Sequence, residues 1–408
     1  MDLSPVDADI SGPTFVDKSA PKGLVFHFAD GAKPLSTPWQ VSIERAKLVR
    51  RLELPSGRII DPACGSGIQL AAYCAILERE GFGIELEEKT AISAVANFHR
   101  IAEHGFGESV MNSIIRIGDG TCADNVTEKF AMLHIDPARP RNSRSHDIGE
   151  MEPPLDQIFA TWKGNLEHGN RGPAILLDLS PRLSHNQRLQ VEKIVENYWP
   201  NIDLTWTWTS RGGGRIDRLS LWAGQLADPL VRQRYVRIPP DIKQESLIIE
   251  GTDLAPIIQS NRLPRKGEFV TILDSALVES GLANDWLKCV LPNQEISWMV
   301  TGGRRPQIAH ESKIEYQNSD EKNLIQASGK VVKLLHFELN DETISHLIED
   351  AREYGFGKLT LRIPLDPSLQ PRIQGSIDRQ LSARGGPYVG FVAKHPGDSM
   401  LLLCVVTA

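Results

Sequence analysis

Four acidic residues lie at or just after short apolar segments in the first half of the chain. They are Asp61, Glu85, Asp119 and Asp136. Apolar strand-like segments that alternate with helical ones predict a parallel sheet, and parallel strands end at one edge of their sheet. We therefore expect the four carboxylates along the edge where open α/β sheets bind their ligands. One such acid is commonplace, whereas four in succession indicate a site for a ligand with several polar groups.

A glycine-containing turn, DPACGSG (61–67), follows the first of these segments. Gly65 and Gly67 allow a ligand to approach the backbone where the turn leads into a helix. Glu85 is placed to accept hydrogen bonds from both hydroxyls of a ribose. A nicotinamide cofactor would also use such an acid, but Leu70 occupies the position of the third glycine in the dinucleotide fingerprint. Since that glycine supports close packing of the helix over a pyrophosphate, its absence disfavours NAD and FAD.

The elements that must position these residues alternate between strand and helix from residue 58 to about 223. Continuously apolar strands with helical stretches between them, as near 155–168 and 185–198, indicate a parallel sheet covered on both faces. The segments 201–209 and 215–224 flank a glycine-rich turn and predict an antiparallel hairpin at the end of the sheet. The predicted parallel strands are RIID (58–61), FGIEL (82–86), NSIIRI (112–117), AMLHI (131–135) and PAILLDL (173–179).

Three further regions flank this domain, which we place at 58–224. Residues 1–57 are predicted to form an N-terminal extension with one amphipathic helix in WQVSIERAKLVRRL. Residues 225–330, with proline-rich and charged stretches, indicate a connector or small subdomain. Residues 331–408 show a strand–helix–strand pattern, a second helical stretch and two final strands. The predicted fold class is therefore α/β, a doubly wound and mostly parallel sheet that ends in an antiparallel hairpin, with a small C-terminal α+β domain.

The composition is typical of a globular protein. The 408 residues are 41% hydrophobic and 24% charged, with a formal net charge of −7. No apolar run approaches the ~20 residues that span a bilayer, and the acidic N-terminus lacks the features of a signal peptide. The five cysteines have no paired spacing, which favours a reducing compartment and disfavours a zinc site. We therefore expect a cytoplasmic protein without a membrane or metal partner, and the sequence does not decide between monomer and homodimer.

Positive charge clusters in loops despite the negative total. Arg139, Arg141 and Arg144 follow Asp136 directly. They would suit the phosphates that flank a nucleotide substrate, because guanidinium groups bind phosphate oxygens in pairs. The alternative interpretation is ordinary solvated loop charge.

The ordered motifs DPACGSG, GIELEE, GDGT and HIDPARP together resemble those of class I S-adenosylmethionine-dependent methyltransferases. In particular, the chain is similar to archaeal and bacterial methyltransferases with a DPARR-type motif and a C-terminal THUMP-like domain. The corresponding segments are DPARPR (136–141), LLDLSPRLSH (176–185) and residues 331–408. The resemblance covers most of the sequence from about residue 37 and is strongest over 58–223. It implies a Rossmann-like fold, S-adenosylmethionine as the cofactor and RNA as the substrate.

The resemblance also implies roles for individual residues. The first turn would hold the amino-acid end of the cofactor, Glu85 its ribose and Asp119 its adenine, with the DPA segment beside the transferable methyl group. The implied cofactor-binding residues are Asp61, Ala63, Gly65, Gly67, Glu85, Leu86, Asp119 and Gly120. The implied catalytic residues are Asp136, Pro137 and Ala138, and the implied substrate-binding residues are Arg139, Arg141 and Arg144.

The expected reaction is direct in-line methyl transfer to a base of structured RNA, with tRNA as the expected RNA and a guanine nitrogen as the expected target. Covalent catalysis at pyrimidine carbon 5 needs a thiolate, and neither Cys64 nor Cys122 lies beside the DPAR motif. Three departures from the family pattern bear on the substrate. Pro140 replaces an arginine, and Asp178 replaces a common lysine, which would remove a positive charge from the site. LRIPLDP (361–367) replaces the usual basic turn of the terminal domain. A methyltransferase for a protein or small molecule, and a non-catalytic RNA-binding factor with the cofactor fold, are the alternatives.

Aromatic and histidine residues admit two interpretations. Trp206, Trp208 and Trp222 could stack on a base, but their alternating spacing favours packing of the hairpin against the core. His134 and His185 are candidate acid–base groups, although lone histidines are more often structural.

Overall fold

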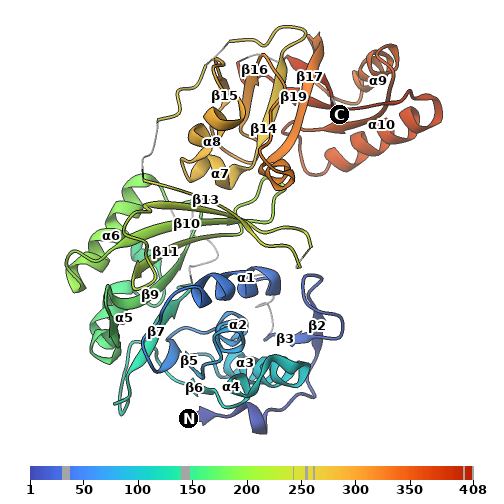
Figure 1. Cartoon of the computed structure of the whole chain (residues 1–408). Coiled ribbons are helices and arrows are strands. Elements are labelled where there is room, and N and C mark those ends of the chain that lie inside the picture. The colour runs from blue at the N-terminus through green and yellow to red at the C-terminus, as the bar shows by residue number, and fades with distance from the viewer. Residues whose placement is uncertain are drawn as a thin grey trace. The chain divides into compact units, whose positions relative to one another are not determined.

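The protein is described by a computed structural model covering residues 1–29, 37–138, 148–241, 243–252, 256–260, 262–397 and 400–406 (Figure 1). It contains two compact units. Residues 1–209 and 217–252 form the N-terminal unit, and residues 210–216 and 253–408 form the C-terminal unit. Each unit is built around its own sheet.

A mostly parallel sheet forms the centre of the N-terminal unit. Its strands, in order across the sheet, are β1 (Asp2–Leu3), β6 (Ile114–Ile117), β5 (Gly81–Glu85), β4 (Arg58–Asp61), β7 (Phe130–Ile135), β9 (Gly172–Leu179), β11 (Arg218–Gly224), β10 (Leu204–Ser210), β12 (Gln233–Arg237) and β13 (Leu247–Gly251), with β8 (His168–Gly169) beside β9. Strands β6, β5, β4, β7 and β9 are parallel. β11 and β10 follow as an antiparallel pair. The predicted doubly wound sheet and its antiparallel hairpin are confirmed, but the sheet does not end at the hairpin, because β12 and β13 continue it beyond β10.

Helices cover both faces of this sheet (Figure 1). One face carries α1 (Trp39–Arg50), α2 (Ile68–Leu77), α3 (Glu88–Ile101) and α4 (Glu108–Met111), and the other carries α5 (Leu155–Trp162) and α6 (His185–Tyr198). In α3, Ala91, Val95 and Phe98 recur at helical spacing and are buried in the core, so one face of the helix packs on the sheet. The helix α6 begins with a capping box between Ser184 and Gln187, which satisfies backbone donors of its first turn.

The N-terminal extension is integral to this unit. β1 pairs with β6 at the edge of the sheet, and β2 (Thr14–Val16) forms a small hairpin with β3 (Val25–His27). The predicted helix is present as α1, but its polar face is also buried. Gln40 donates to the Pro239 carbonyl, and Arg45 is 1% exposed. The prediction of an ordinary amphipathic helix missed these buried partners because they lie far away in the sequence.

The C-terminal unit contains a second, mostly antiparallel sheet. Its strands, in order, are β15 (Ser297–Val300), β16 (Gln307–His310), β14 (Phe269–Leu273), β17 (Ile325–Leu335), β20 (Leu401–Val405), β19 (Tyr388–Lys394) and β18 (Phe356–Leu361). β18 and β19 are parallel and are connected through α10 (Gln370–Arg384). α9 (Ile344–Glu353) and α10 pack over one core, while α7 (Ser275–Glu279) and α8 (Ala283–Val290) precede β15. The predicted α+β character of residues 331–408 is confirmed.

The boundaries between the units differ from the predicted ones. β12 and β13 extend the first sheet, and β14 pairs with β16 and β17 in the second. Residues 225–330 are therefore shared between the two units and do not form a separate connector. Their strands are only four or five residues long, which gives too little periodicity for a sequence pattern to place them in either sheet.

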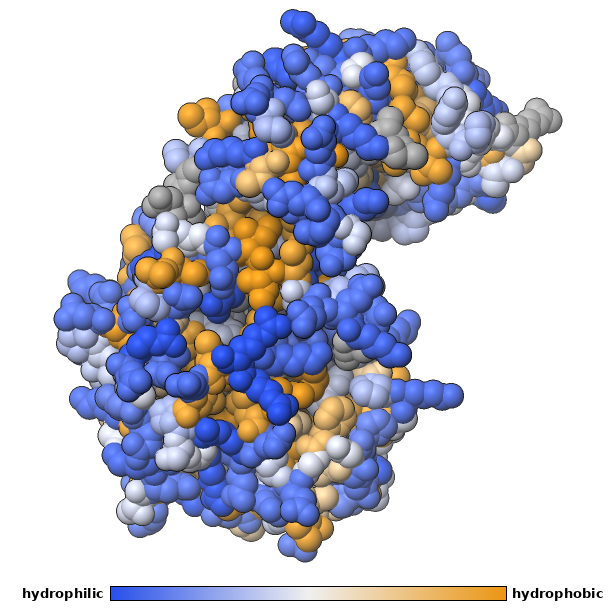
Figure 2. Space-filling model, in the orientation of Figure 1, coloured by the Kyte–Doolittle hydropathy of each residue, from blue (hydrophilic) through white to orange (hydrophobic). Residues whose placement is uncertain are grey.

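The tryptophans of the hairpin belong to the core. Trp206, Trp208 and Trp222 are each 1% exposed, which confirms packing over base stacking. Trp206 Nε1 donates a hydrogen bond to Glu192 of α6, and this bond connects the hairpin to that helix. On the face drawn in Figure 2, hydrophobic residues emerge between hydrophilic ones over the N-terminal unit, as is usual for protein surfaces.

Candidate active site

The strand order reverses at β4. From β4 it runs through β5 to β6, and it then returns to β7 on the other side of β4. In open α/β sheets such a switch point opens a crevice beyond the carboxyl ends of the strands. Asp61 ends β4, Glu85 ends β5, and Asp119 and Asp136 follow β6 and β7. The structure therefore brings all four predicted acids to one edge of the sheet.

The turn after β4 is held against the end of β5. Ala63 N donates to Asp61 Oδ1 at 3.1 Å, and Gly65 N donates to Glu85 Oε2 at 3.0 Å. Gly67, at φ +70°, precedes α2, and a Cβ there would lie 2.9 Å from Phe98 Cε2. Gly65, at φ +53°, has open space where its Cβ would be. The turn is thus packed on its helix side and open at Gly65, where a ligand can approach the backbone.

Glu85 is fixed by two backbone donors. Besides Gly65 N, it accepts a hydrogen bond from Glu87 N at 2.9 Å. Desolvation raises the pKa of Glu85 above its ordinary value, and the two backbone bonds oppose this rise. A carboxylate has about four acceptor positions, so two remain for ligand hydroxyls. The neighbouring Leu86 is 74% exposed and offers an apolar surface beside this carboxylate.

The GDGT turn packs directly on the DPACGSG turn. Asp119 Oδ1 accepts from Thr121 N at 2.8 Å and from Thr121 Oγ1 at 2.7 Å, and these bonds lower the pKa of Asp119. The Gly120 carbonyl accepts from Trp162 Nε1 at 2.7 Å. A Cβ on Gly120 would lie 1.8 Å from the Pro62 carbonyl oxygen. Only glycine permits this approach of the two turns.

Replacing Gly120 with alanine is expected to separate the two turns. Overpacking of this kind costs about 1–3 kcal/mol in unfolding free energy, and the displaced turn should weaken nucleoside binding at the same edge. Gly118→Ala is the matched control, because a Cβ there would lie 3.8 Å from Arg116 Cγ. Urea denaturation of both variants measures the difference. Equal stability of the two would show that the close contact between the turns is unimportant.

Behind the strand ends, His134 lies between two buried carboxylates. Its Nδ1 is 2.7 Å from Asp61 Oδ2, and its Nε2 is 3.2 Å from Asp178 Oδ2. All three residues are at most 2% exposed. Burial disfavours the charged imidazole, but the two carboxylates outweigh this effect and raise the pKa of His134 to about 9. His134 is therefore an imidazolium at neutral pH, held between two buried carboxylates, which corresponds to the structural interpretation of a lone histidine.

Asp178 has a second cationic partner, Arg45 of α1. Arg45 Nη1 donates to Asp178 Oδ2 at 2.6 Å and Nη2 donates to Oδ1 at 2.5 Å, in bidentate geometry. Ser220 Oγ donates to the same carboxylate at 2.8 Å. Burial would raise the pKa of Asp178, but Arg45 and His134 hold it well below its ordinary value. The predicted loss of positive charge at Asp178 is thus offset by Arg45, which sequence reasoning missed.

The imidazolium makes stability depend on pH. The pKa of His134 rises from an ordinary 6.5 to about 9 on folding, so its contribution is fully present below pH 6.5 and is lost as the pH rises through 9. The free energy of unfolding should therefore fall by about 3 kcal/mol as the pH rises between these values. Urea denaturation across this pH range measures the change, and His134→Gln should remove this dependence. A wild-type stability that stays constant over the range would contradict a buried imidazolium.

Asp136 lies at the outer end of this charged group. Its side chain is 42% exposed, and Oδ2 is 3.6 Å from Arg218 Nη2. Partial desolvation raises the pKa of Asp136, while Arg218 opposes the rise. Pro137 is buried, and Ala138 exchanges backbone hydrogen bonds of 2.8 and 2.9 Å with Glu152. The DPA turn is therefore anchored while its carboxylate faces solvent.

The remaining predictions concern four residues that follow the DPA turn in sequence, and His185. Arg139, Arg141 and Arg144, together with Pro140, lie outside the described residues. His185 is the exposed first residue of α6.

Cys64 is buried, and desolvation raises its pKa well above the ordinary value, so the thiol stays protonated at neutral pH. Within the described ranges, no group of three His, Cys, Asp or Glu side chains is arranged to hold a metal ion. No helix in the described part of the chain is long and apolar enough to cross a membrane.

A solved structure shares this architecture over most of the chain. A Porphyromonas gingivalis protein, provisionally named a methyltransferase, superposes with a TM-score of 0.55 at 15% identity, covering 93% of this chain and 83% of its own. This likeness defines the Rossmann-like fold. Two further solved structures match about half of the chain. A Listeria monocytogenes protein provisionally named a class I S-adenosylmethionine-dependent methyltransferase has a TM-score of 0.36 at 12% identity, covering 50% of this chain and 64% of its own. A Clostridium thermocellum protein provisionally named an rRNA methylase has a TM-score of 0.31 at 9% identity, covering 44% of this chain and 95% of its own. No family model and no curated protein matches the sequence.

Proposed function

We propose that this chain is an S-adenosylmethionine-dependent methyltransferase that modifies a base of structured RNA by direct methyl transfer. The observation that carries the proposal is the series of four carboxylates at one sheet edge, on both sides of the switch point at β4. A plain strand–turn–helix would not need an acid at each of four neighbouring strand ends. The two turns beside these carboxylates also lie so close together that only glycine fits at position 120.

The donors and acceptors at this edge fit S-adenosylmethionine. Glu85 keeps acceptor positions for the ribose hydroxyls, and the exposed Leu86 beside it suits an apolar purine face. Both hydrogen bonds to Asp119 go to Oδ1, so Oδ2 can accept from an adenine amino group. The open backbone at Gly65 suits the amino-acid end of the cofactor, and the buried Asp61 carboxylate supports this turn through Ala63 N and His134. Ala63, Gly67 and Gly120 complete the proposed cofactor site by shaping its two turns.

The cofactor, when bound, supplies an electrophilic methyl group on a sulfonium. The protein then needs to align the acceptor and exclude water. The DPA turn has a partly exposed carboxylate with a raised pKa, and its backbone is hydrogen-bonded to Glu152. Asp136 can accept a hydrogen bond from an amino or ring N–H of a base and take up the proton that this nitrogen releases. Pro137 and Ala138 hold it in place.

A guanine nitrogen in RNA, with tRNA as the expected molecule, is the proposed target. Guanine presents N–H donors on its Watson–Crick edge, which match a carboxylate acceptor, and exposed bases of single-stranded loops are the usual targets of RNA recognition. Arg139, Arg141 and Arg144 directly follow the DPA turn in sequence and would contact flanking phosphates. The C-terminal unit, for which a THUMP-like role is proposed, would provide a second RNA-binding surface.

Transfer of a labelled methyl group distinguishes this substrate from the alternatives. The protein is incubated with labelled S-adenosylmethionine and, separately, with bulk tRNA, rRNA or a cell protein extract. Label in tRNA is expected, and nucleoside mass spectrometry of that RNA should identify a methylated guanosine. Label found only in protein would rule out the RNA substrate and favour the protein alternative, which is in keeping with the net charge of −7.

A further inference from the structure

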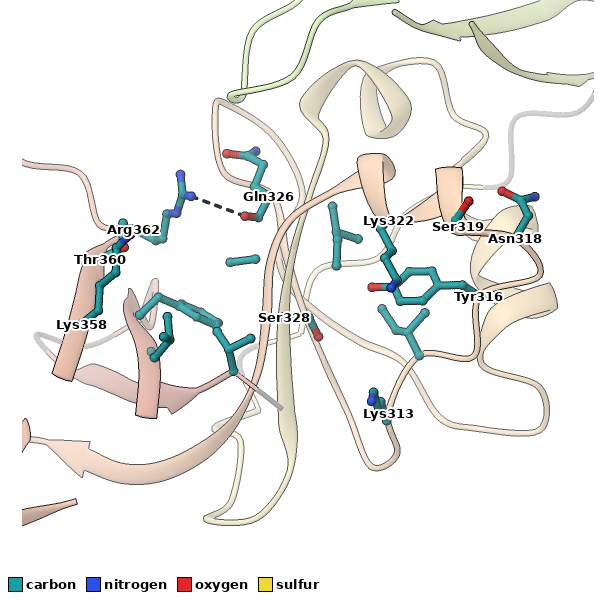
Figure 3. A pocket seen from close by; sticks show the side chains of 17 residues that line it. Lys313, Tyr316, Asn318, Ser319, Lys322, Gln326, Ser328, Lys358, Thr360 and Arg362 are labelled. Carbon is teal, nitrogen blue, oxygen red and sulfur yellow. Dashed lines mark hydrogen bonds between the residues drawn. The ribbon is translucent and has the colours of Figure 1, made fainter. Parts of the chain in front are cut away.

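The C-terminal unit has a pocket of about 930 Å³ that is separate from the sheet edge described above (Figure 3). All of its lining residues lie between 313 and 406, within one unit. They come from the first half of β17, from the segment 313–322 before it, and from β18 and β19. The volume is within the range of pockets that bind small molecules, about 300–1,000 Å³.

The pocket lies where the second sheet opens. Within the described residues, β20 ends at Val405 and pairs with β17 from Lys330 onward. The preceding residues of β17, 325–329, pair with β14 on their other side. The Gln326 carbonyl oxygen is 3.5 Å from Arg362 Nη2, which reaches across this opening from the end of β18 (Figure 3). The backbone edge and side chains of β17 therefore form the floor of the pocket.

The charge of the pocket is positive. Four of its lining residues are cationic: Lys313, Lys322, Lys358 and Arg362. None of the described lining residues is acidic. The Arg362 side chain is partly desolvated, which lowers its pKa, and its Nε is buried without a hydrogen-bond partner among the described residues. A guanidinium in this state gains from an anion that restores the lost hydrogen bonds.

Polar and aromatic groups accompany the charge. Lys358, Thr360 and Arg362 line one side of the pocket, and Lys322 and Tyr316 line the other (Figure 3). Burial raises the pKa of Tyr316 to about 12, so its phenol stays neutral and can donate a hydrogen bond. An aromatic ring opposite a cationic strand suits a base next to its phosphate, because stacking is sequence-tolerant and phosphate binds guanidinium.

We propose that this pocket binds a nucleoside phosphate, with the phosphate on Lys358 and Arg362 and the base against Tyr316. An added peptide strand would also suit the edge of β17 that no described strand covers, but it does not require a pocket with four cations and, among the described lining residues, no acid. The same chemistry is available from a free nucleotide and from one unit of an RNA strand. Binding of an RNA strand in this pocket rests on the proposed function, whereas binding of a free nucleotide does not.

Binding of a labelled single-stranded RNA of about ten nucleotides, a length typical of such sites, tests the proposal by fluorescence anisotropy. GMP, AMP and inorganic phosphate serve as competitors. The test variant is Lys358→Gln/Arg362→Gln. The matched control is Lys266→Gln/Lys288→Gln, which removes the same charge from the C-terminal unit outside the pocket. Since Arg362 is partly buried, Lys322→Glu at an exposed position is a second test variant that does not disturb packing.

The test variants should bind RNA at least tenfold more weakly than the control. In the double variant, the dependence of RNA affinity on salt concentration should also be weaker, by the amount expected for the loss of about two phosphate contacts. Competition by GMP and AMP would identify a free-nucleotide site, and binding of RNA alone would identify a strand site. Three results would overturn the proposal: test variants that bind like the control, no binding of any probe to the wild type, or phosphate competing as well as GMP.

Calorimetry with S-adenosylmethionine on the same preparations separates this inference from the proposed function. If S-adenosylmethionine binds but the pocket variants bind RNA like the control, only the proposed pocket is refuted. Pocket binding of nucleotide without cofactor binding would refute the methyltransferase alone.

Discussion

Replacing Asp136 with asparagine is expected to abolish methyl transfer while S-adenosylmethionine still binds. Asparagine has the size of aspartate, so the anchored DPA turn should keep its conformation. Asparagine lacks the negative charge that attracts the N–H group of the base, and it cannot accept a proton. Loss of such a proton acceptor typically lowers the rate by a factor of about 10²–10⁴. Cofactor affinity should change little, because the proposed cofactor contacts come from the turns after β4, β5 and β6.

Single-turnover assays with labelled cofactor measure the rate, and calorimetry measures affinity. Asp156→Asn is the matched control, since Asp156 is an exposed acid in the first turn of α5 and is not one of the four strand-end acids. Full turnover in Asp136→Asn would remove Asp136 from the reaction. Loss of cofactor binding together with activity would place it in the cofactor site and contradict its position on the substrate side.

Replacing Arg45 with alanine should destabilise the N-terminal unit by about 3–5 kcal/mol, because it leaves the buried Asp178 without its bidentate partner. Both side chains of this pair are at most 2% exposed. Denaturation at pH 7 measures the loss. The activity of the folded fraction should also fall, since the same charges position His134 and, through it, Asp61.

A surface pair on the same helix provides the control. Arg50 of α1 is 3.2 Å from Glu78, and both side chains are well exposed. Arg50→Ala should cost no more than about 1 kcal/mol, because water screens exposed pairs. If Arg45→Ala cost no more than Arg50→Ala, the buried group of charges would not organise the site as we describe.

Much of the fold could be predicted from local sequence patterns. Continuously apolar segments identified the strands before Asp61, Glu85 and Asp136, and parallel pairing then required these acids to share an edge. The C-terminal strands β19 and β20 were also recognisable from their apolar residues. The short strands β12 to β16 were not, because pairing with distant partners decides which sheet they join.

The interior of the site could not be predicted in the same way. The partnership of Arg45 with Asp178 spans 133 positions, and no spacing rule connects them. His134 and Asp178 were visible as polar residues in apolar strands. This signal could have marked them as buried partners, because unpaired charges are rarely buried. The cationic partner on α1 required the fold itself.

Calorimetric titration of the purified chain with S-adenosylmethionine tests the central claim most directly. We expect one binding site with a dissociation constant in the micromolar to millimolar range usual for enzyme ligands, and loss of this site in Glu85→Ala. Absence of binding at millimolar cofactor, with a folded protein, would contradict the proposed methyltransferase function.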